Sequence, residues 1–204
     1  MKLLHIDSSV TGAHSVSREL SRLIVDTLAA AGPLDIRYRD LVAEDLPHFT
    51  AATAPTAHQL SQAAPATDAA QQAARATSDA ILKEFIEADV IVLGVPMYNF
   101  TVPSQLKAWL DRIVVPGTTF RRGANGIEGL AGDKRVLLAI ARGGVYDEAS
   151  AARSVEHGES LLRALLGFLG VSRIESVVAE GLIVAETKDA TIAAAREAAR
   201  RIAA

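Results

Sequence analysis

A cluster of hydroxyl side chains follows the first apolar segment of the chain, in the sequence SSVTGAHSVSREL. The hydroxyl groups come from Ser8, Ser9, Thr11, Ser15 and Ser17. Gly12 permits a turn, and a helix is predicted to begin near Ser15–Ser17. The amides and the dipole of a helix start attract a phosphate, and hydroxyl groups complete its hydrogen bonding. The GxxxxGK[ST] and GxGxxG motifs are both absent, which favours a phosphomonoester as the ligand. Serine is also a common N-cap residue, so capping alone is the alternative.

A second group of candidate residues ends the apolar run VIVLGV, where the sequence continues PMYNFTVPSQLKAWLDR. A buried strand would deliver Met97, Tyr98, Asn99 and Phe100 to the rim of a sheet. Polarisable and aromatic side chains form a wall for a flat aromatic ligand, and polar groups hydrogen-bond the edge of a heterocycle. The alternative is that the aromatic rings only pack against the sheet edge. Pro103 then begins a helix.

A third candidate segment is ARGGVYDE, in which Arg142 precedes Gly143 and Gly144. Paired glycines allow a backbone to approach a ligand closely. They are equally common in ordinary turns, which is the alternative interpretation. A ligand-binding role for this segment requires that it lie beside the other two candidate segments.

Five short apolar segments alternate with helical segments and must position these residues. The expected strands lie in KLLHID, LDIRYRD, DVIVLGV, RVLLAIA and SRIESVVAEG, and continuous apolar runs predict burial on both faces. The expected helices cover roughly residues 17–31, 69–88, 104–114, 150–169 and 188–203. This alternation predicts an α/β fold with a doubly wound parallel sheet and helices on both faces. The three candidate segments follow strands, so they would meet at the carboxyl edge of the sheet.

The composition of the chain narrows its class. The 204 residues are 50% hydrophobic and carry a net charge of −3, which predicts one domain, 1–204. Basic residues are scattered, so no nucleic acid and no membrane surface is expected as a partner. The absence of cysteine excludes disulfides, thiolate nucleophiles and cysteine-bound zinc. The first residues contain no long apolar run, so a cytoplasmic protein is expected.

One stretch, at about 46–68, interrupts the alternation with prolines, alanines and threonines. It is expected to be an excursion from the domain. A structureless loop of this length is uncommon unless it serves a site or an interface, although a solvated loop is equally open.

The segments SSVTGAHSVS, GVPMYNFTVPSQLKAWLDRI, TFRRGANGIEGL, ARGGVY and LLGFLGV together resemble the FMN-dependent NADH-azoreductases, also described as NADH:quinone oxidoreductases, of the flavodoxin-like superfamily. The resemblance covers the whole chain, and PMYNF followed by PxxLK is its most specific part. It implies a flavodoxin-like, five-stranded sheet in the order 2-1-3-4-5 and a homodimer with FMN at each of two interface sites. It also implies NADH or NADPH as the electron donor, with quinones and azo compounds as acceptors.

The resemblance assigns roles to residues motif by motif. It places four residues around the FMN phosphate, namely Ser9, Ser15, Val16 and Ser17. It places four along the isoalloxazine, namely Met97, Tyr98, Asn99 and Phe100. On the other side of the isoalloxazine it places Ala141, Arg142, Gly143 and Gly144. Relatives often carry serine at the position of Ala141, and some carry tyrosine near the flavin at the position of Arg122. These departures leave the shape of the acceptor pocket open.

The flavin itself would carry the redox chemistry, so no catalytic side chain and no metal ligand are assigned. Arg142 and nearby main-chain dipoles are expected to stabilise negative charge near N1 of the reduced ring. A single open face would take the nicotinamide and then the acceptor, which predicts ping-pong turnover. The five histidines have no partner motif and are expected to be structural or solvated.

Two other classes share part of this pattern. A flavodoxin-type electron carrier would have the same fold and FMN, but such carriers are usually shorter and more acidic. A serine esterase with its nucleophile in IDSSVTG would need a histidine near the C-terminus, and no histidine follows His157. Rapid NADH oxidation would distinguish an enzyme from a carrier.

Overall fold

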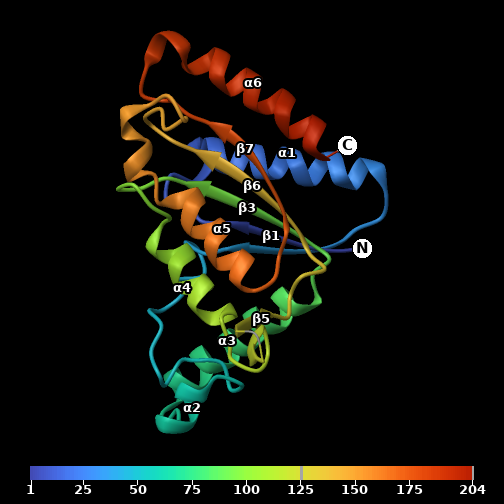
Figure 1. The fold of residues 1–204 in the computed structure, drawn as a ribbon, viewed down its shortest axis with the longest axis vertical. Helices are drawn as coiled ribbons and strands as arrows, with labels where there is room; N and C mark the ends of the chain where they lie inside the picture. The colour runs from blue at the N-terminus through green and yellow to red at the C-terminus, as the bar shows by residue number, and fades with distance from the viewer. Residues whose placement is uncertain (125, 204) are drawn as a thin grey trace.

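A five-stranded parallel sheet forms the centre of the protein in the computed structural model, which describes residues 1–124 and 126–203 (Figure 1). Its strands are β1 (Lys2–Asp7), β2 (Asp35–Asp40), β3 (Val90–Pro96), β6 (Arg135–Ala141) and β7 (Arg173–Ala179). They lie in the order β2-β1-β3-β6-β7, which confirms the order 2-1-3-4-5 for this sheet. Asn125, within one of the quoted motifs, and Ala204, the last residue of the expected domain, lie outside the described residues.

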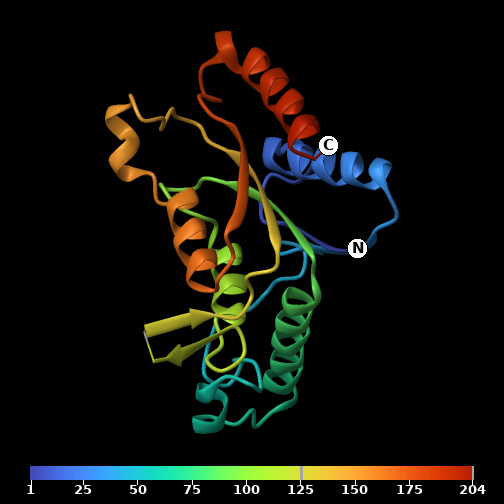
Figure 2. The ribbon, with the colours of Figure 1, turned by 45° about the vertical axis from the view of Figure 1, so that its right-hand side comes forward.

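Helices cover both faces of the sheet, as the sequence predicts (Figures 1 and 2). One layer contains α1 (Val16–Ala31) and α6 (Ala185–Ala203), which pack together. The other contains α3 (Ala69–Glu87), α4 (Ser104–Ile113) and α5 (Gly158–Phe168). Each layer encloses its own hydrophobic core against the sheet. The two cores fix the sheet, and with it the loops at its carboxyl edge.

The segment 150–169 is divided, and its prediction as one helix is wrong. A 3-10 turn, η2 (Ala151–Val155), precedes α5. Between them, the buried carboxylate of Glu156 accepts hydrogen bonds from the main-chain N–H groups of Gly158 at 2.9 Å and Glu159 at 2.7 Å. A carboxylate at this place satisfies the free amides of a helix start. Glu156 therefore specifies where α5 begins.

Burial on both faces is confirmed for β3 but is wrong for β2. Every residue of β3 is buried, whereas Ile36 and Tyr38 of β2 are 44% and 48% exposed. The reason is position: β2 is an edge strand paired only with β1, and the helical layers centre on the inner strands. Apolar composition alone does not distinguish an edge from a centre.

The excursion between β2 and α3 packs against the helices and includes the short helix α2 (Gln59–Ala63). Two arginines hold it by donating to main-chain carbonyl oxygens: Arg112 to Pro47 at 2.8 Å and Arg75 to Ala52 at 3.1 Å. Figures 1 and 2 show α2 at the end of the molecule opposite α6. The excursion therefore lies away from the loops that follow β6 and β7.

A small antiparallel hairpin, β4 (Phe120–Gly123) and β5 (Gly126–Gly129), is an element that the apolar pattern does not predict. It packs on the end of α5, where the rings of Phe120 and Phe168 lie 4.7 Å apart. A Cβ atom on Gly129 would lie only 2.1 Å from the main-chain N of Gly170. Glycine is thus required where the hairpin meets the main domain.

Candidate functional site

The loops that follow β1, β3, β6 and β7 surround a cavity of about 170 Å³ at the carboxyl edge of the sheet. It is lined by Ser9, Thr11, His14, Ser15, Val16, Pro96, Met97, Tyr98, Ala141, Arg142, Gly143 and Leu182. The three segments singled out in the sequence therefore meet in space. Four predicted site residues do not line the cavity: Ser17 is fully buried, Asn99 and Phe100 are exposed, and Gly144 follows the lining residue Gly143.

Ser15 caps helix α1 and also lines the cavity. Its Oγ accepts a hydrogen bond from the main-chain N–H of Arg18 at 3.3 Å and lies 3.1 Å from the Oγ of Ser17. The first amides of a helix have no partner within the helix and are available to an anion. Capping and phosphate binding are therefore compatible at this residue.

Tyr98 connects two of the segments around the cavity: the aromatic wall, residues 97–100, and the serine loop, residues 8–17. Its hydroxyl lies 3.2 Å from the Oγ of Ser9 and accepts a hydrogen bond from the main-chain N–H of Val10 at 3.2 Å. Ser9 Oγ is also 3.0 Å from Thr11 Oγ1. The wall and the serine loop are thus held in one arrangement.

The wall continues into a strained two-residue turn. Tyr98 and Thr101 exchange main-chain hydrogen bonds of 3.0 and 3.1 Å, and between them Asn99 and Phe100 have φ angles of 47° and 72°. Left-handed backbone is unfavourable for a bulky residue such as phenylalanine and costs of order 1–3 kcal/mol. Surrounding structure maintains it, since the carbonyl of Phe100 accepts a 2.8 Å hydrogen bond from the N–H of His157. Such strain concentrates at functional sites.

Arg142 has a different environment from the one expected. The Arg142 side chain is 4% exposed. Its guanidinium lies 2.6 Å from a carboxylate oxygen of Glu159, and the carboxylates of Glu156 and Glu180 each lie 3.6 Å from it. These carboxylates pair with its charge, and the role expected of this side chain near a reduced flavin stays a prediction. Burial opposes ionisation of Glu159, but hydrogen bonds from Ser176 and Arg163 lower its pKa. Arg142 and its neighbours Ala141 and Gly143 nevertheless line the cavity.

A fourth loop, between β7 and α6, supports the main chain of residues 142–144. The N–H groups of Gly181, Leu182 and Ile183 donate to the carbonyls of Gly144, Arg142 and Gly143 at 2.9, 3.2 and 3.2 Å. Leu182 lines the cavity, yet the sequence pattern did not single it out. The signal was available, because this loop also follows a strand of the parallel sheet. Thr11, which belongs to the predicted hydroxyl cluster, also lines the cavity, as do His14 and Pro96, which were not assigned to FMN.

A buried polar network lies behind the serine loop. Asp7, at the end of β1, accepts hydrogen bonds from Ser21 Oγ at 2.7 Å and from the Tyr38 hydroxyl at 3.1 Å, and His5 Nε2 lies 3.0 Å from Ser21 Oγ. Burial and then the charge of Asp7 raise the pKa of Tyr38 to about 12. His5, Asp7 and Ser21 are all buried, so these three residue types do not form a nucleophilic site here. His5 is structural, as expected.

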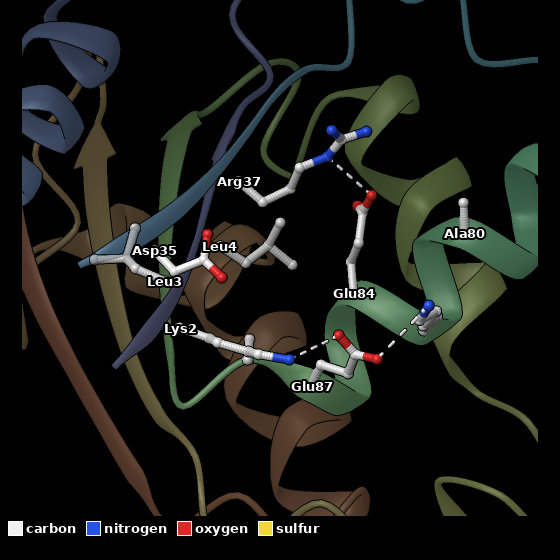
Figure 3. A pocket seen from close by; sticks show the side chains of 10 residues that line it. Lys2, Leu3, Leu4, Asp35, Arg37, Ala80, Glu84 and Glu87 are labelled. Atoms are coloured by element: carbon white, nitrogen blue, oxygen red, sulfur yellow. Dashed lines mark hydrogen bonds and ion pairs between the residues drawn. The ribbon is translucent and has the colours of Figure 1, made fainter.

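A larger hollow of about 390 Å³ lies at the opposite end of β1 and β2, against α3 (Figure 3). Most of its charged side chains pair with one another, including Arg37 with Glu84 at 2.9 Å and Lys2 with Glu87 at 3.0 Å. Figure 3 shows the two pairs beside apolar Leu3 and Leu4. This hollow is not the largest, because one of about 690 Å³, lined in part by Asp7, Ser15 and Arg18, is larger. The ion pairs occupy most of the charged groups that line the hollow against α3, which argues against a charged ligand there.

Other candidate features do not add to the cavity. Arg122 lies exposed on β4 and is not among the lining residues. Within residues 1–124 and 126–203, no helix has the length and apolarity needed to cross a membrane. The same residues contain no group of three or more His, Cys, Asp or Glu side chains arranged to hold a metal ion.

The fold and the cavity together define a protein of the flavodoxin-like class. A family model described as "Flavodoxin-like fold" matches residues 1–203, and the chain belongs to this family. It is 57% identical over 205 residues to the "FMN-dependent NADH:quinone oxidoreductase" of Methylobacterium radiotolerans, with 100% of both chains covered.

Solved structures give the same likeness. The crystal structure of azoreductase from Bacillus anthracis str. Sterne is 30% identical, with a TM-score of 0.87, and the match covers 100% of this chain and 98% of that one. An FMN-dependent NADH-azoreductase from Bacillus anthracis str. Ames Ancestor, solved in complex with FMN, is 26% identical with a TM-score of 0.83. That match covers 100% of this chain and 99% of the other.

Proposed function

We propose that this protein is an FMN-dependent NADH:quinone oxidoreductase that also reduces azo compounds. The observation that carries the proposal is the meeting of a hydroxyl-rich helix start, an aromatic wall and a glycine-containing loop around one cavity. The names of its relatives support it, because they combine FMN, NADH and quinone or azo reduction.

The residues around the cavity fit FMN. Hydroxyl groups of Ser9 and Ser15 and the first amides of α1, at Val16 and Ser17, suit its phosphate. Met97 and Tyr98 provide a polarisable wall for the isoalloxazine. FMN would supply the redox chemistry, accepting a hydride from NADH and passing two electrons to the acceptor. The chain's own residues bind and orient it, and none is required to donate a proton.

The main chain of 141–144 would contact the edge of the ring system. Ala141, Arg142 and Gly143 line the cavity, and the loop after β7 holds the carbonyl groups of Arg142 and Gly143 in place. Fixed main-chain dipoles stabilise charge without reorganising during a reaction. This role is proposed in addition to the one predicted for the Arg142 side chain, whose charge pairs with three carboxylates.

The cofactor proposal is tested by the visible spectrum of the purified protein. We expect flavin absorbance equivalent to about one FMN per chain, as the resemblance implies, and rapid bleaching by NADH with reoxidation by a quinone. Bound flavin that NADH reduces only slowly would favour an electron carrier. Colourless protein that FMN does not reconstitute would refute the proposal.

Turnover is expected to be ping-pong, because the wall and the 141–144 loop would leave one open face for both flat substrates. After hydride transfer, NAD⁺ would have to leave before a quinone could bind. Initial rates with a quinone, varied at several fixed NADH concentrations, should give parallel double-reciprocal lines. Intersecting lines would mean that both substrates bind at once and would contradict this account of the site.

The protein is further proposed to work as a homodimer in the cytoplasm, where NADH is available. Support for the dimer comes from the resemblance, and from exposed apolar side chains at loops around the cavity. Phe100 is 50% exposed and Ile183 is 80% exposed. Apolar side chains gathered at one surface are typical of interfaces and ligand sites.

A further inference from the structure

Arg18 occupies the first turn of α1, next to the cavity but not among its lining residues. Its guanidinium donates to the carbonyl of Ser9 from Nε at 3.3 Å and from Nη2 at 2.8 Å. It also forms a two-pronged pair with Asp40, at the end of β2, at 2.6 and 2.7 Å. Arg18 therefore joins the serine loop, α1 and β2 through one side chain.

The contact with Ser9 determines which groups of the loop face the cavity. The carbonyl oxygen of Ser9 is turned toward Arg18, while Ser9 itself lines the cavity and its Oγ contacts Thr11 and Tyr98. A carbonyl oxygen repels a phosphate, whereas hydroxyl and amide groups bind it. Holding that carbonyl away leaves the cavity to hydrogen-bond donors.

Arg18 also lies near the carboxylate of Asp7, which would repel a bound anion. Asp7 is 4% exposed and stands two residues before Ser9, and one of its oxygens is 4.0 Å from Arg18 Nη1. Ser21 and Tyr38 face Asp7 from other elements as uncharged donors, and His5 lies 3.6 Å from it on the same strand, β1. Like charges in a poorly hydrated place repel strongly, so the single positive charge of Arg18 reduces the repulsion that Asp7 and Asp40 would exert on a nearby phosphate.

The charge of Arg18 is itself well fixed. The hydrogen bond from Arg18 lowers the pKa of Asp40, and the same bond raises the pKa of Arg18. Both groups are therefore ionised at neutral pH. Asp40 additionally accepts the main-chain N–H of Val42 at 3.1 Å, which anchors it to the turn after β2.

We propose that Arg18 is a positioning residue for the phosphate of FMN, acting through the Ser9 carbonyl and offsetting the charge of Asp7. The inference rests on the proposed function, because it assumes that FMN is the cofactor. It predicts that Arg18 matters for the phosphate and not for the ring system. A purely structural role, as a tie between α1 and β2, would affect every flavin equally.

The test compares FMN with riboflavin, which has the same ring but no phosphate. In Arg18→Gln, we expect FMN to bind at least about tenfold more weakly, since hydrogen bonds to charged groups are among the stronger ones, while riboflavin binding changes less than about twofold. Arg18→Lys retains the positive charge but has a simpler donor group, so its affinity for FMN should fall less than that of Arg18→Gln. Affinities come from fluorescence quenching of each flavin by the apoprotein.

Arg22→Gln is the matched control, because Arg22 lies one turn further along α1 with its side chain 80% exposed. It should leave both affinities unchanged. If Asp40 acts by holding Arg18, Asp40→Asn should weaken FMN binding in the wild type but add little in Arg18→Gln.

The outcomes separate the two proposals. Wild-type protein that binds neither flavin refutes the proposed cofactor. Wild-type protein that binds FMN, with Arg18→Gln and Arg18→Lys losing FMN and riboflavin equally or losing neither, overturns the role of Arg18 alone. Thermal unfolding of each variant identifies a fall in affinity that comes from loss of folded protein.

Discussion

Phe100 combines a strained backbone with a half-exposed ring. Its φ angle of 72° is one that glycine adopts freely, and its side chain is 50% exposed. Phe100→Gly should therefore raise the free energy of unfolding of the apoprotein by about 1 kcal/mol, because relief of backbone strain exceeds the small loss of packing. Urea denaturation measures this change.

Phe100→Ala is the control for that change, since it removes the ring but keeps the strained backbone. Only the glycine variant should gain stability. Both variants should bind FMN more weakly if the ring belongs to the wall of the site. Equal stability of the two variants would show that the turn stores no strain.

Gly94, in the middle of β3, lies directly against the polar network behind the serine loop. A Cβ atom at this position would be 2.2 Å from Asp7 Oδ1 and 3.1 Å from Ser21 Oγ. Gly94→Ala should displace Asp7 and lower the free energy of unfolding by about 1–3 kcal/mol. Gly167→Ala, where a Cβ meets nothing within 4 Å, should be neutral or stabilising. Similar denaturation midpoints for the two variants would contradict the close contact.

The types and spacing of residues predicted most of the cavity but not the pairing of Arg142. Serines before a helix and an aromatic run after a strand carry local signals that a single sequence displays. The carboxylates around Arg142 lie at 156, 159 and 180, and nothing local links them to it. Charge partners distant in sequence depend on packing, which sequence patterns do not reveal.

At the level of elements, the excursion is held in place by a buried arginine that donates to main-chain carbonyls. Arg112 is fully buried and donates to the carbonyls of Pro47 and Ala108 at 2.8 and 2.6 Å. Arg112→Met should lower the free energy of unfolding by about 2 kcal/mol or more, because it leaves buried acceptors unpaired. Limited proteolysis should also cut within residues 47–64 more rapidly.

Arg121→Met is the comparison for Arg112, since Arg121 forms an exposed pair with Glu128 on the hairpin. Exposed pairs contribute about 0–1 kcal/mol, so this variant should unfold much like the wild type. If Arg112→Met were as stable and as resistant to protease as Arg121→Met, Arg112 would not be the anchor of the excursion.

The strands and helices of the main sheet follow from apolar periodicity, whereas the excursion and the hairpin do not. The Pro-, Ala- and Thr-rich stretch has no periodic face, and its order comes from Arg75 and Arg112 on neighbouring helices. The hairpin forms because Gly129 permits contact with the backbone at Gly170. Both depend on contacts that exist only once the sheet and its helices have formed.

At the scale of the whole molecule, the proposed homodimer makes activity depend on concentration. The site sits among exposed apolar residues, including Val10 at 56% and Val145 at 45%, which a second copy would cover. Light scattering at micromolar concentration should give twice the mass of one chain, and activity per chain should fall as dilution separates the copies. A fully active monomer would contradict the dimer.

The cavity draws its lining from Ser9 near the start of the chain to Leu182 near its end. During synthesis, the serine loop therefore leaves the ribosome long before the loop that supports residues 141–144. A nascent chain paused before residue 182 would have the proposed phosphate-binding half of the site without the completed proposed ring-binding half. Stable retention of FMN should then begin only after residue 182 has emerged, and a truncated chain released before that point would carry none.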